Sequence, residues 1–219
     1  MSVADLLDPL REPLVTVLGT TVGWSEILGF GSGALCVWLV ARRHVANWPV
    51  GIANNLFYLL LFAGAGLYAD AALQVVFIVL AAFGWWVWTH GGGPESAGSP
   101  PVRRSTRAEW GMLIAAGTVG TAALTVLLGR FTDSTVPFWD ALTTALSLAA
   151  TYGQCRKLIE SWWLWIAADL VYVPLYAYKG LYLTSLLYVG FIALCVTGLR
   201  GWHRDLGAAR PAPAAEALA

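Results

Sequence analysis

Residues 66–88 read GLYADAALQVVFIVLAAFGWWVW, and residues 180–202 read GLYLTSLLYVGFIALCVTGLRGW. The two stretches align without a gap at a shift of 114 residues, with GLY on GLY, FI on FI, and Gly84 and Trp88 on Gly198 and Trp202. The match extends to residues 24–88 against 138–202, where 19 of 65 pairs are identical. Apolar composition raises chance identity, but coincidences of Trp, Tyr, Arg and Gly are hard to obtain that way. The sequence therefore predicts an internal duplication.

The composition is that of a membrane protein. Of the 219 residues, 58% are hydrophobic and 12% are charged, whereas an average soluble domain carries roughly 25% charge. The mean hydropathy is +0.65. These values exclude a disordered chain, a disulfide-stapled secreted domain and an ordinary soluble enzyme. The formal net charge of zero gives no indication of a nucleic-acid partner.

Seven apolar stretches are long enough to cross a bilayer as helices, which takes about 17–25 residues each. Leu14–Val22 is too short to cross alone, so we expect it to extend the first helix or to lie at the interface. The seven predicted spans are Trp24–Ala41, Asn47–Ala63, Leu67–Thr89, Ala108–Leu128, Pro137–Gln154, Ser161–Tyr178 and Leu181–Leu199.

The distribution of Lys and Arg predicts the orientation of these spans. One side would carry Arg42, Arg43, Arg103, Arg104, Arg107, Arg156, Lys157, Arg200, Arg204 and Arg210, and the other only Arg11, Arg130 and Lys179. Basic residues concentrate in cytoplasmic loops. We therefore expect the N-terminus outside the cell membrane and the C-terminus in the cytoplasm.

The repeat and the spans together predict an all-α integral membrane protein with a 3+1+3 arrangement. Because four crossings separate the first helix from the fifth, the two three-helix repeats are parallel, and the fourth helix links them. The expected segments are an extracytoplasmic N-terminus (1–23), the first repeat (24–89), a cytoplasmic loop (90–107), the linker helix (108–129), the second repeat (130–202) and a cytoplasmic tail (203–219). Bundles built from such repeats are typical of transporters, because the interface between the halves can open to either side.

Aromatic and polar side chains share one face of the second helix in each repeat. In the later repeat they follow the spacing i, i+3, i+7, i+10, i+14, which places them on one side of a helix. The earlier repeat has Asn55 where the later one has Asp169, and Gln74 lies at membrane depth on the next helix. The candidate substrate-binding residues are Trp162, Trp165, Asp169, Asn55, Tyr172, Gln74, Trp48 and Tyr176.

Asp169 is the most informative of these residues. An ionised carboxylate at the middle of a membrane helix costs at least about 2.5–3.5 kcal/mol on insertion scales, so such residues usually face a cavity and bind substrate. No Lys or Arg lies at a similar depth in the predicted helices. An aromatic stack beside an acid suits a flat, positively charged ring. A purely structural role for Asp169, by pairing inside the bundle, is the alternative.

The sequence resembles the PnuC-type vitamin transporter family. The resemblance rests on the 3+1+3 repeat, on the W-x-x-W-x-x-x-[N/D] pattern at Trp162, Trp165 and Asp169, and on the runs WPVGIANNLFYLLLF (48–62) and GLYLTSLLY (180–188). It covers residues 24–202. It implies a SWEET-like fold and uptake of nicotinamide riboside by facilitated diffusion, with trapping by phosphorylation inside the cell and without a cofactor. It also implies a possible homotrimer.

Two features leave the cargo open. Family members often carry Asn where this chain has Asp169, and related branches move thiamine, which is also a flat cation, or riboflavin. A carrier of the same fold for a neutral sugar or nucleoside is a further alternative, in which Asp169 only accepts hydrogen bonds from hydroxyl groups. An intramembrane enzyme is disfavoured, because only Asn55 stands opposite Asp169 and no catalytic motif is present.

Overall fold

The protein folds into seven helices and one short β-hairpin in the part of the chain that the computed structural model describes, residues 13–17, 20–64, 66–92, 99–132 and 134–208. Each helix corresponds to one predicted span, and two of them match the prediction at both ends. The predicted fold class is therefore confirmed. The helices are α2 (Trp24–Ala41), α3 (Asn47–Gly64), α4 (Tyr68–His90), α5 (Arg107–Phe131), α6 (Pro137–Cys155), α7 (Ser161–Tyr178) and α8 (Tyr182–Ala208).

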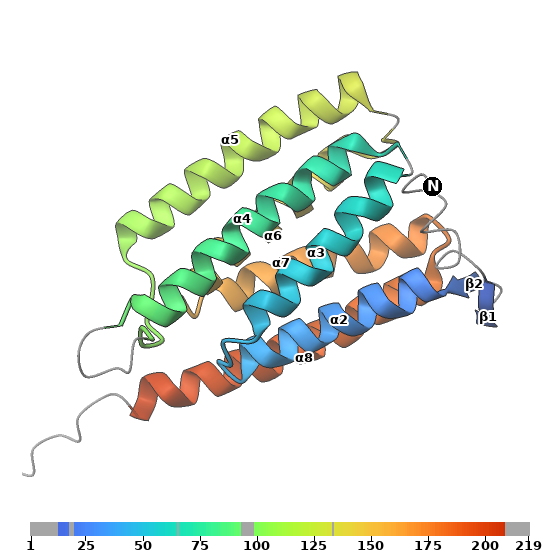
Figure 1. Ribbon diagram of the computed structural model, residues 1–219. Helices are drawn as coiled ribbons and strands as arrows, with labels where there is room; N and C mark the ends of the chain where they lie inside the picture. The colour runs from blue at the N-terminus through green and yellow to red at the C-terminus, as the bar shows by residue number, and fades with distance from the viewer. Residues whose placement is uncertain (1–12, 18–19, 65, 93–98, 133, 209–219) are drawn as a thin grey trace, which may run out of the picture.

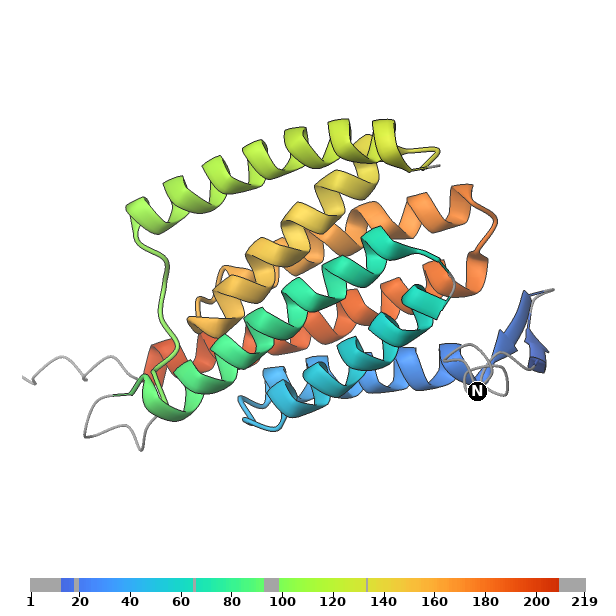
Figure 2. The same ribbon diagram turned by 45° about the horizontal axis from the view of Figure 1, so that its top comes forward.

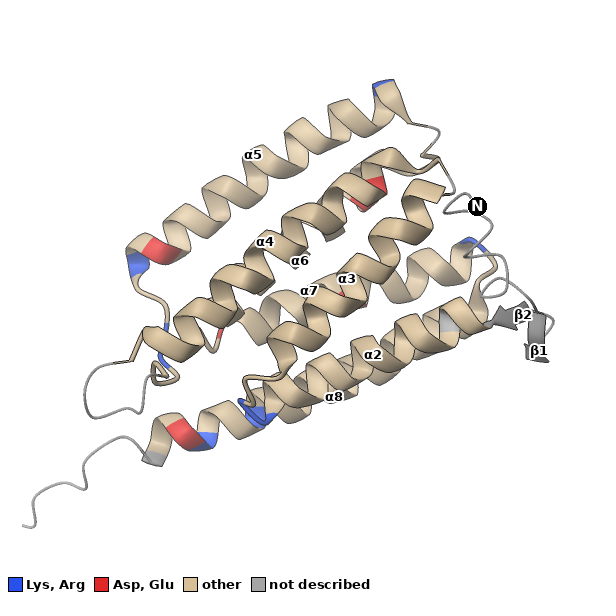
Figure 3. Cartoon of the chain, in the orientation of Figure 1, with Lys and Arg blue, Asp and Glu red and all other residues tan. Residues whose placement is uncertain are grey.

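The helices form two three-helix bundles, α2–α3–α4 and α6–α7–α8, which meet along α2 with α8 and α4 with α6. The helix α2 runs in the same direction as α6, so the repeats are parallel (Figure 1). The helix α5 packs on α6 and lies outside both bundles (Figure 2). Most charged residues lie at the two ends of the helices (Figure 3). We call the end at which α3, α5 and α7 begin the basic end, since it carries Arg42, Arg43, Arg103, Arg104, Arg107, Arg156, Lys157 and Arg200.

The polarity of the helices differs in a way that anticipates the site. The helices α4, α5 and most of α8 (Tyr182–Gly207) are by themselves long and apolar enough to cross a membrane. The helices α3 and α7 carry Asn54, Asn55 and Asp169, and these side chains lower their hydropathy. A helix with such residues depends on its neighbours to keep polar groups away from lipid.

The backbone repeats itself at the same shift of 114 residues. Two residues after the first helix of each repeat ends, the chain has a residue with positive φ, Arg43 at 56° and Lys157 at 51°. The second helix of each repeat is followed in the same way by Gly66 at 76° and Gly180 at 75°. A left-handed residue after a helix lets the next amide reach back to a free carbonyl. The amide of His44 binds the carbonyl of Leu39 at 2.9 Å in this way. The two halves therefore end their helices by the same turns.

Two segments differ from the sequence-based expectation. Pro13–Val17 (β1) and Thr20–Gly23 (β2) pair as an antiparallel hairpin, so the apolar stretch 14–22 does not extend the first helix. The helix α8 continues past the predicted span end at Leu199 to Ala208. Hydropathy marks where a helix leaves the bilayer, whereas hydrogen bonding decides where it ends, and Asp205 of this extension pairs with Arg43. Residues 209–219, expected to form a tail, lie outside the described residues.

One aromatic contact recurs in both repeats. The indole of Trp48 lies on Gly84 and that of Trp162 lies on Gly198, so closely that a Cβ at either glycine would collide with the ring. The rings then meet Trp88 and Trp202 edge-on, with centroids 5.3 Å and 5.4 Å apart. All four tryptophans are buried. Each bundle is thus fixed at the basic end by an indole that fills the space left by a missing side chain.

We predict that Gly198→Ala lowers the stability of the protein, because the added methyl group displaces the buried Trp162 ring. Overpacking of this kind costs about 1–3 kcal/mol, which corresponds to a fall of roughly 2–12 °C in the thermal midpoint. The measurement is thermal unfolding of the detergent-solubilised protein followed by tryptophan fluorescence. Gly190→Ala is the matched control on α8, since nothing lies within 4 Å of an added Cβ there. Equal midpoints for the two variants would contradict the prediction.

Candidate binding cavity

A cavity of about 360 Å³ lies between the two bundles and is lined by residues of α2, α3, α4, α6, α7 and α8. Both repeats therefore contribute to its wall. The structure brings six of the eight predicted site residues together here; their role in binding remains a prediction. They are Trp48, Asn55, Gln74, Trp162, Trp165 and Asp169.

The other two predicted residues, Tyr172 and Tyr176, lie further along α7 and are not among those that line the cavity. Their rings stack on each other at 5.6 Å, and both contact Tyr188 of α8, at 4.7 Å and 5.2 Å between centroids. The first part of the predicted face of α7 therefore lines the cavity, whereas Tyr172 and Tyr176 pack against α8 of the same repeat.

Sequence reasoning missed several residues of the wall. Tyr58, Tyr188, Phe191 and Cys195 all line the cavity. The duplication contains a signal for two of them, because Tyr188 stands at the repeat position of Gln74, and Tyr58 at that of Tyr172. Phe191 and Cys195 continue the face of α8 that begins at Tyr188, at spacings of three and four residues.

Asp169 is the one acidic residue among the described residues that line the cavity. It is 4% exposed, and the thiol of Cys195 lies 3.8 Å from its Oδ2 atom. A thiol is a weak donor, so this contact offsets little of the cost of burying a carboxylate. Among the described residues that line the cavity, none is Lys, Arg or His. The carboxylate is therefore available to a cationic or hydrogen-bonding ligand.

Amide groups provide the polar surface of the first repeat. Asn54 is held within its own bundle, where its Nδ2 atom donates to the carbonyl of Gly29 at 3.2 Å and to Ser32 Oγ at 2.6 Å. Asn55 occupies the repeat position of Asp169. The cavity thus has one acidic wall, on the second repeat, and one neutral amide wall, on the first.

Two of the four tryptophans described above, Trp48 and Trp162, line the cavity, and Trp88 and Trp202 pack edge-on against them without lining it. Trp88 Nε1 donates to the carbonyl of Gln154 at 3.0 Å, and Trp202 Nε1 donates to the carbonyl of Val40 at 3.3 Å. Val40 and Gln154 are equivalent residues of the two repeats. Each repeat therefore ends in an indole that is hydrogen-bonded to the first helix of the other repeat. These bonds tie the two bundles together.

Lys157 lies against Trp88, in the connection between α6 and α7. It is 5% exposed, its Nζ atom donates to Ser99 Oγ at 2.7 Å, and it lies 4.5 Å from the centroid of the Trp88 ring. Burial, with a smaller contribution from Arg43, lowers the pKa of Lys157 to about 8. The charged form of this side chain is therefore destabilised in the folded protein.

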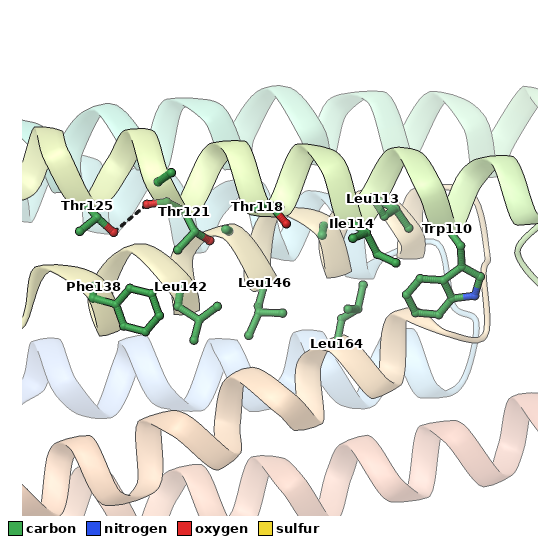
Figure 4. Close-up of a pocket in the computed structure, with 14 residues that line it drawn as sticks. Trp110, Leu113, Ile114, Thr118, Thr121, Thr125, Phe138, Leu142, Leu146 and Leu164 are labelled. Atoms are coloured by element: carbon green, nitrogen blue, oxygen red, sulfur yellow. Dashed lines mark hydrogen bonds between the residues drawn. The ribbon is translucent and has the colours of Figure 1, made fainter.

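A second and larger hollow, of about 630 Å³, lies between α5, α6 and α7 (Figure 4). Its wall is mostly apolar, with side chains such as Leu113, Leu142 and Leu164. One of its hydroxyls is already satisfied, because Thr125 Oγ1 donates to the carbonyl of Thr121 at 2.7 Å. This hollow therefore lacks the charged and amide groups that a polar ligand requires.

Comparison with known proteins identifies the family. The model of the nicotinamide mononucleotide transporter family matches residues 23–204. The chain belongs to this family. Family members are transporters, so the protein is a multi-pass membrane transporter of the vitamin-carrying type and not an enzyme.

Individual relatives and one solved structure support this assignment. The chain is 34% identical to the riboflavin/roseoflavin transporter RibM of Streptomyces davaonensis over 82% of this chain and 84% of RibM. It is 26% identical to the nicotinamide riboside transporter PnuC of Escherichia coli over 84% of this chain and 87% of PnuC. The crystal structure of the vitamin B3 transporter PnuC matches the fold with a TM-score of 0.65 and 22% identity, covering 85% of this chain and 83% of that one.

We predict that Asp169→Ala weakens ligand binding strongly, because it removes the charge of the cavity. Loss of one partner of a buried charged contact costs about 2–5 kcal/mol, or at least a 30-fold rise in Kd. Trp86→Phe should leave binding unchanged, because Trp86 is 60% exposed and is not among the cavity-lining residues. The measurement is calorimetric titration of the purified variants. Equal losses in both would show that the cavity is not the binding site.

We also predict a pH dependence of stability that arises from Lys157. Its pKa of about 8 in the folded protein lies below the value of about 10.4 expected for an unfolded lysine. Between these values the unfolded chain binds more protons, so the free energy of unfolding rises with pH. As the pH rises from 8 to 10, the thermal midpoint of the unaltered protein should therefore increase relative to the midpoint of Lys157→Met.

Lys157→Arg is the matched control, because arginine stays charged throughout this range. Its midpoint should keep a constant difference from that of Lys157→Met. A constant difference for the unaltered protein as well would contradict the assignment of the effect to Lys157.

Proposed function

We propose that the protein takes up nicotinamide riboside across the cell membrane by facilitated diffusion, and that phosphorylation inside the cell then traps the vitamin. The observation that carries this proposal is the buried carboxylate of Asp169, which faces a cavity without a basic residue among its described lining. A pyridinium ring carries the positive charge that such a carboxylate favours. Trp162 and Trp165 on the same helix supply aromatic surfaces for it.

Riboflavin is the second candidate, because the chain is 34% identical to RibM and 26% identical to the PnuC transporter of Escherichia coli. Riboflavin and nicotinamide riboside each join a flat heteroaromatic ring to a hydroxyl-rich group, which is an open chain in riboflavin and a ribose ring in nicotinamide riboside. In this case Asp169 would accept hydrogen bonds from the ligand rather than pair with a positive charge. Thiamine, a flat cation with one hydroxyl group, remains an alternative on the grounds of charge.

The proposed mechanism is an exchange between two arrangements of the bundles around the cavity. The bundles rock against each other along the interface at which α2 contacts α8 and α4 contacts α6. In the structure the indole bonds of Trp88 and Trp202 join the bundles at the basic end, which we assign to the cytoplasm because basic residues concentrate there. Release of the substrate then requires these two bonds to break. The two bundles need no ion or nucleotide for this step, since the gradient of free vitamin drives it.

The test compares two ligands of similar shape and different charge, and adds the two alternative vitamins as further probes. The purified protein is titrated with nicotinamide riboside and with its reduced dihydropyridine form, which is neutral, and with riboflavin and thiamine in parallel. We expect nicotinamide riboside to bind at least about tenfold more tightly than its neutral form, and we expect Asp169→Asn to remove this preference.

The other outcomes either support a different cargo or refute part of the proposal. Binding of riboflavin without nicotinamide riboside would support the second candidate, and a preference for thiamine would support the third. Equal affinity for the charged and neutral forms would refute the role of Asp169 as a counter-ion. Absence of binding by all four compounds would refute the proposed cargo.

A further inference from the structure

The duplication allows each residue of the cavity wall to be compared with its partner in the other repeat. At most positions the two are of similar size, such as Asn55 with Asp169 and Phe77 with Phe191. One pair differs as much as two residues can. Gly51 of α3 stands at the repeat position of Trp165 of α7, and both line the cavity.

Most of the other glycines near the cavity have a structural explanation. The rings of Trp48 and Trp162 occupy the space above Gly84 and Gly198, and the phenol of Tyr58 occupies the space above Gly29. Gly33 also lines the cavity, but its repeat partner is Ser147, so this position is small in both halves.

Gly51 has no such explanation. A Cβ built there would meet only Cys36 Sγ, at 3.4 Å, which is ordinary contact. Glycine within a helix is less favourable than alanine, and no neighbouring ring requires its small size at this position. The space that Gly51 leaves opens into the cavity, to which Trp165 contributes its indole.

Gly51 and Trp165 each lie one helical turn from the polar residue of their repeat. Gly51 precedes Asn55 by four residues on α3, and Trp165 precedes Asp169 by four residues on α7. Side chains four residues apart lie on the same helix face, one turn from each other. Each half of the cavity therefore presents the same polar position, with an aromatic surface beside it in one repeat and free space beside it in the other.

We propose that Trp165 and Gly51 form a slot for the planar ring of the substrate, in which the ring lies against the Trp165 indole and occupies the space left at Gly51. Gly51 then sets the largest ring that the transporter accepts. The slot fixes the direction of the ligand, with its ring between Trp165 and Gly51 and its hydroxyl groups toward the amides of the first repeat. This inference rests on the proposed transport of an aromatic vitamin.

The test is a size series at position 51, made as Gly51→Ala, Gly51→Val and Gly51→Leu. Riboflavin, nicotinamide riboside and thiamine are the probes, titrated calorimetrically into each purified variant. For a probe that binds the unaltered protein, Kd should rise stepwise along the series, by roughly tenfold for valine and 100-fold for leucine. The loss should be larger for the three-ring flavin than for the single pyridinium ring if both bind.

Stability separates this effect from a structural one. Because alanine favours the helix and its Cβ meets only Cys36 Sγ, at 3.4 Å, Gly51→Ala should keep or raise the thermal midpoint while it weakens binding. Gly190→Leu is the control on α8, at an exposed position where nothing lies within 4 Å of an added Cβ. It should leave Kd within twofold of the unaltered protein.

A double variant tests whether the two residues act on the same ring. If they do, Gly51→Leu combined with Trp165→Leu loses no more affinity than the worse single variant, since each change already displaces or unseats the ring. Multiplied losses, or a Kd for Gly51→Leu within twofold of that for Gly190→Leu, would overturn the slot. Failure of the unaltered protein to bind all three probes would instead overturn the proposed cargo, and the slot with it.

Discussion

The packing of an indole onto a glycine is the contact on which the rest of this structure depends. Trp48 on Gly84 and Trp162 on Gly198 bring the second and third helices of each repeat close together at the basic end. The same rings set the positions of Trp88 and Trp202, which bond to the opposite bundle. A tryptophan buries a large apolar area, and its edge-on contacts add directional preference. One kind of contact therefore orders each bundle, joins the two and limits the cavity.

The cavity reflects a balance between stability and binding. A bundle in lipid gains most from close packing of small and apolar groups, and it loses when it holds a carboxylate or leaves space unfilled. This chain does both within the cavity, with Asp169 in the wall of the second repeat and Gly51 in the wall of the first. The tightly packed tryptophans at the basic end supply the rigidity that such a site needs. Trp48 and Trp162 belong to both parts, because they pack on the two glycines and also line the cavity.

Much of the fold could be read from the sequence because hydropathy and repetition both act on single helices. The ends of α2 and α7 were predicted to the residue, whereas α8 continued nine residues further, since a helix can persist in water once its amides are paired. The hairpin at 13–23 was missed because a short apolar stretch does not reveal whether its partner is a neighbouring strand or a helix.

The site was predictable to the extent that it lies on one helix. The period of 3.6 residues placed Trp162, Trp165 and Asp169 on the face of α7 that meets the cavity. It could not show that Tyr172 and Tyr176 turn to Tyr188 instead, because the length of the cavity depends on how α8 crosses α7. Residues contributed by another helix, such as Phe191, depend on that crossing as well.

The acceptors of the two indole bonds between the bundles are main-chain carbonyls, of Val40 and Gln154. A carbonyl is present whatever the side chain, and these two equivalent residues are an aliphatic one and an amide. After a duplication, the two copies could therefore change their side chains independently without losing the bonds that hold them together. Such freedom allows the two halves of a symmetric ancestor to acquire different side chains. An asymmetric molecule such as a vitamin requires a binding site whose two walls differ.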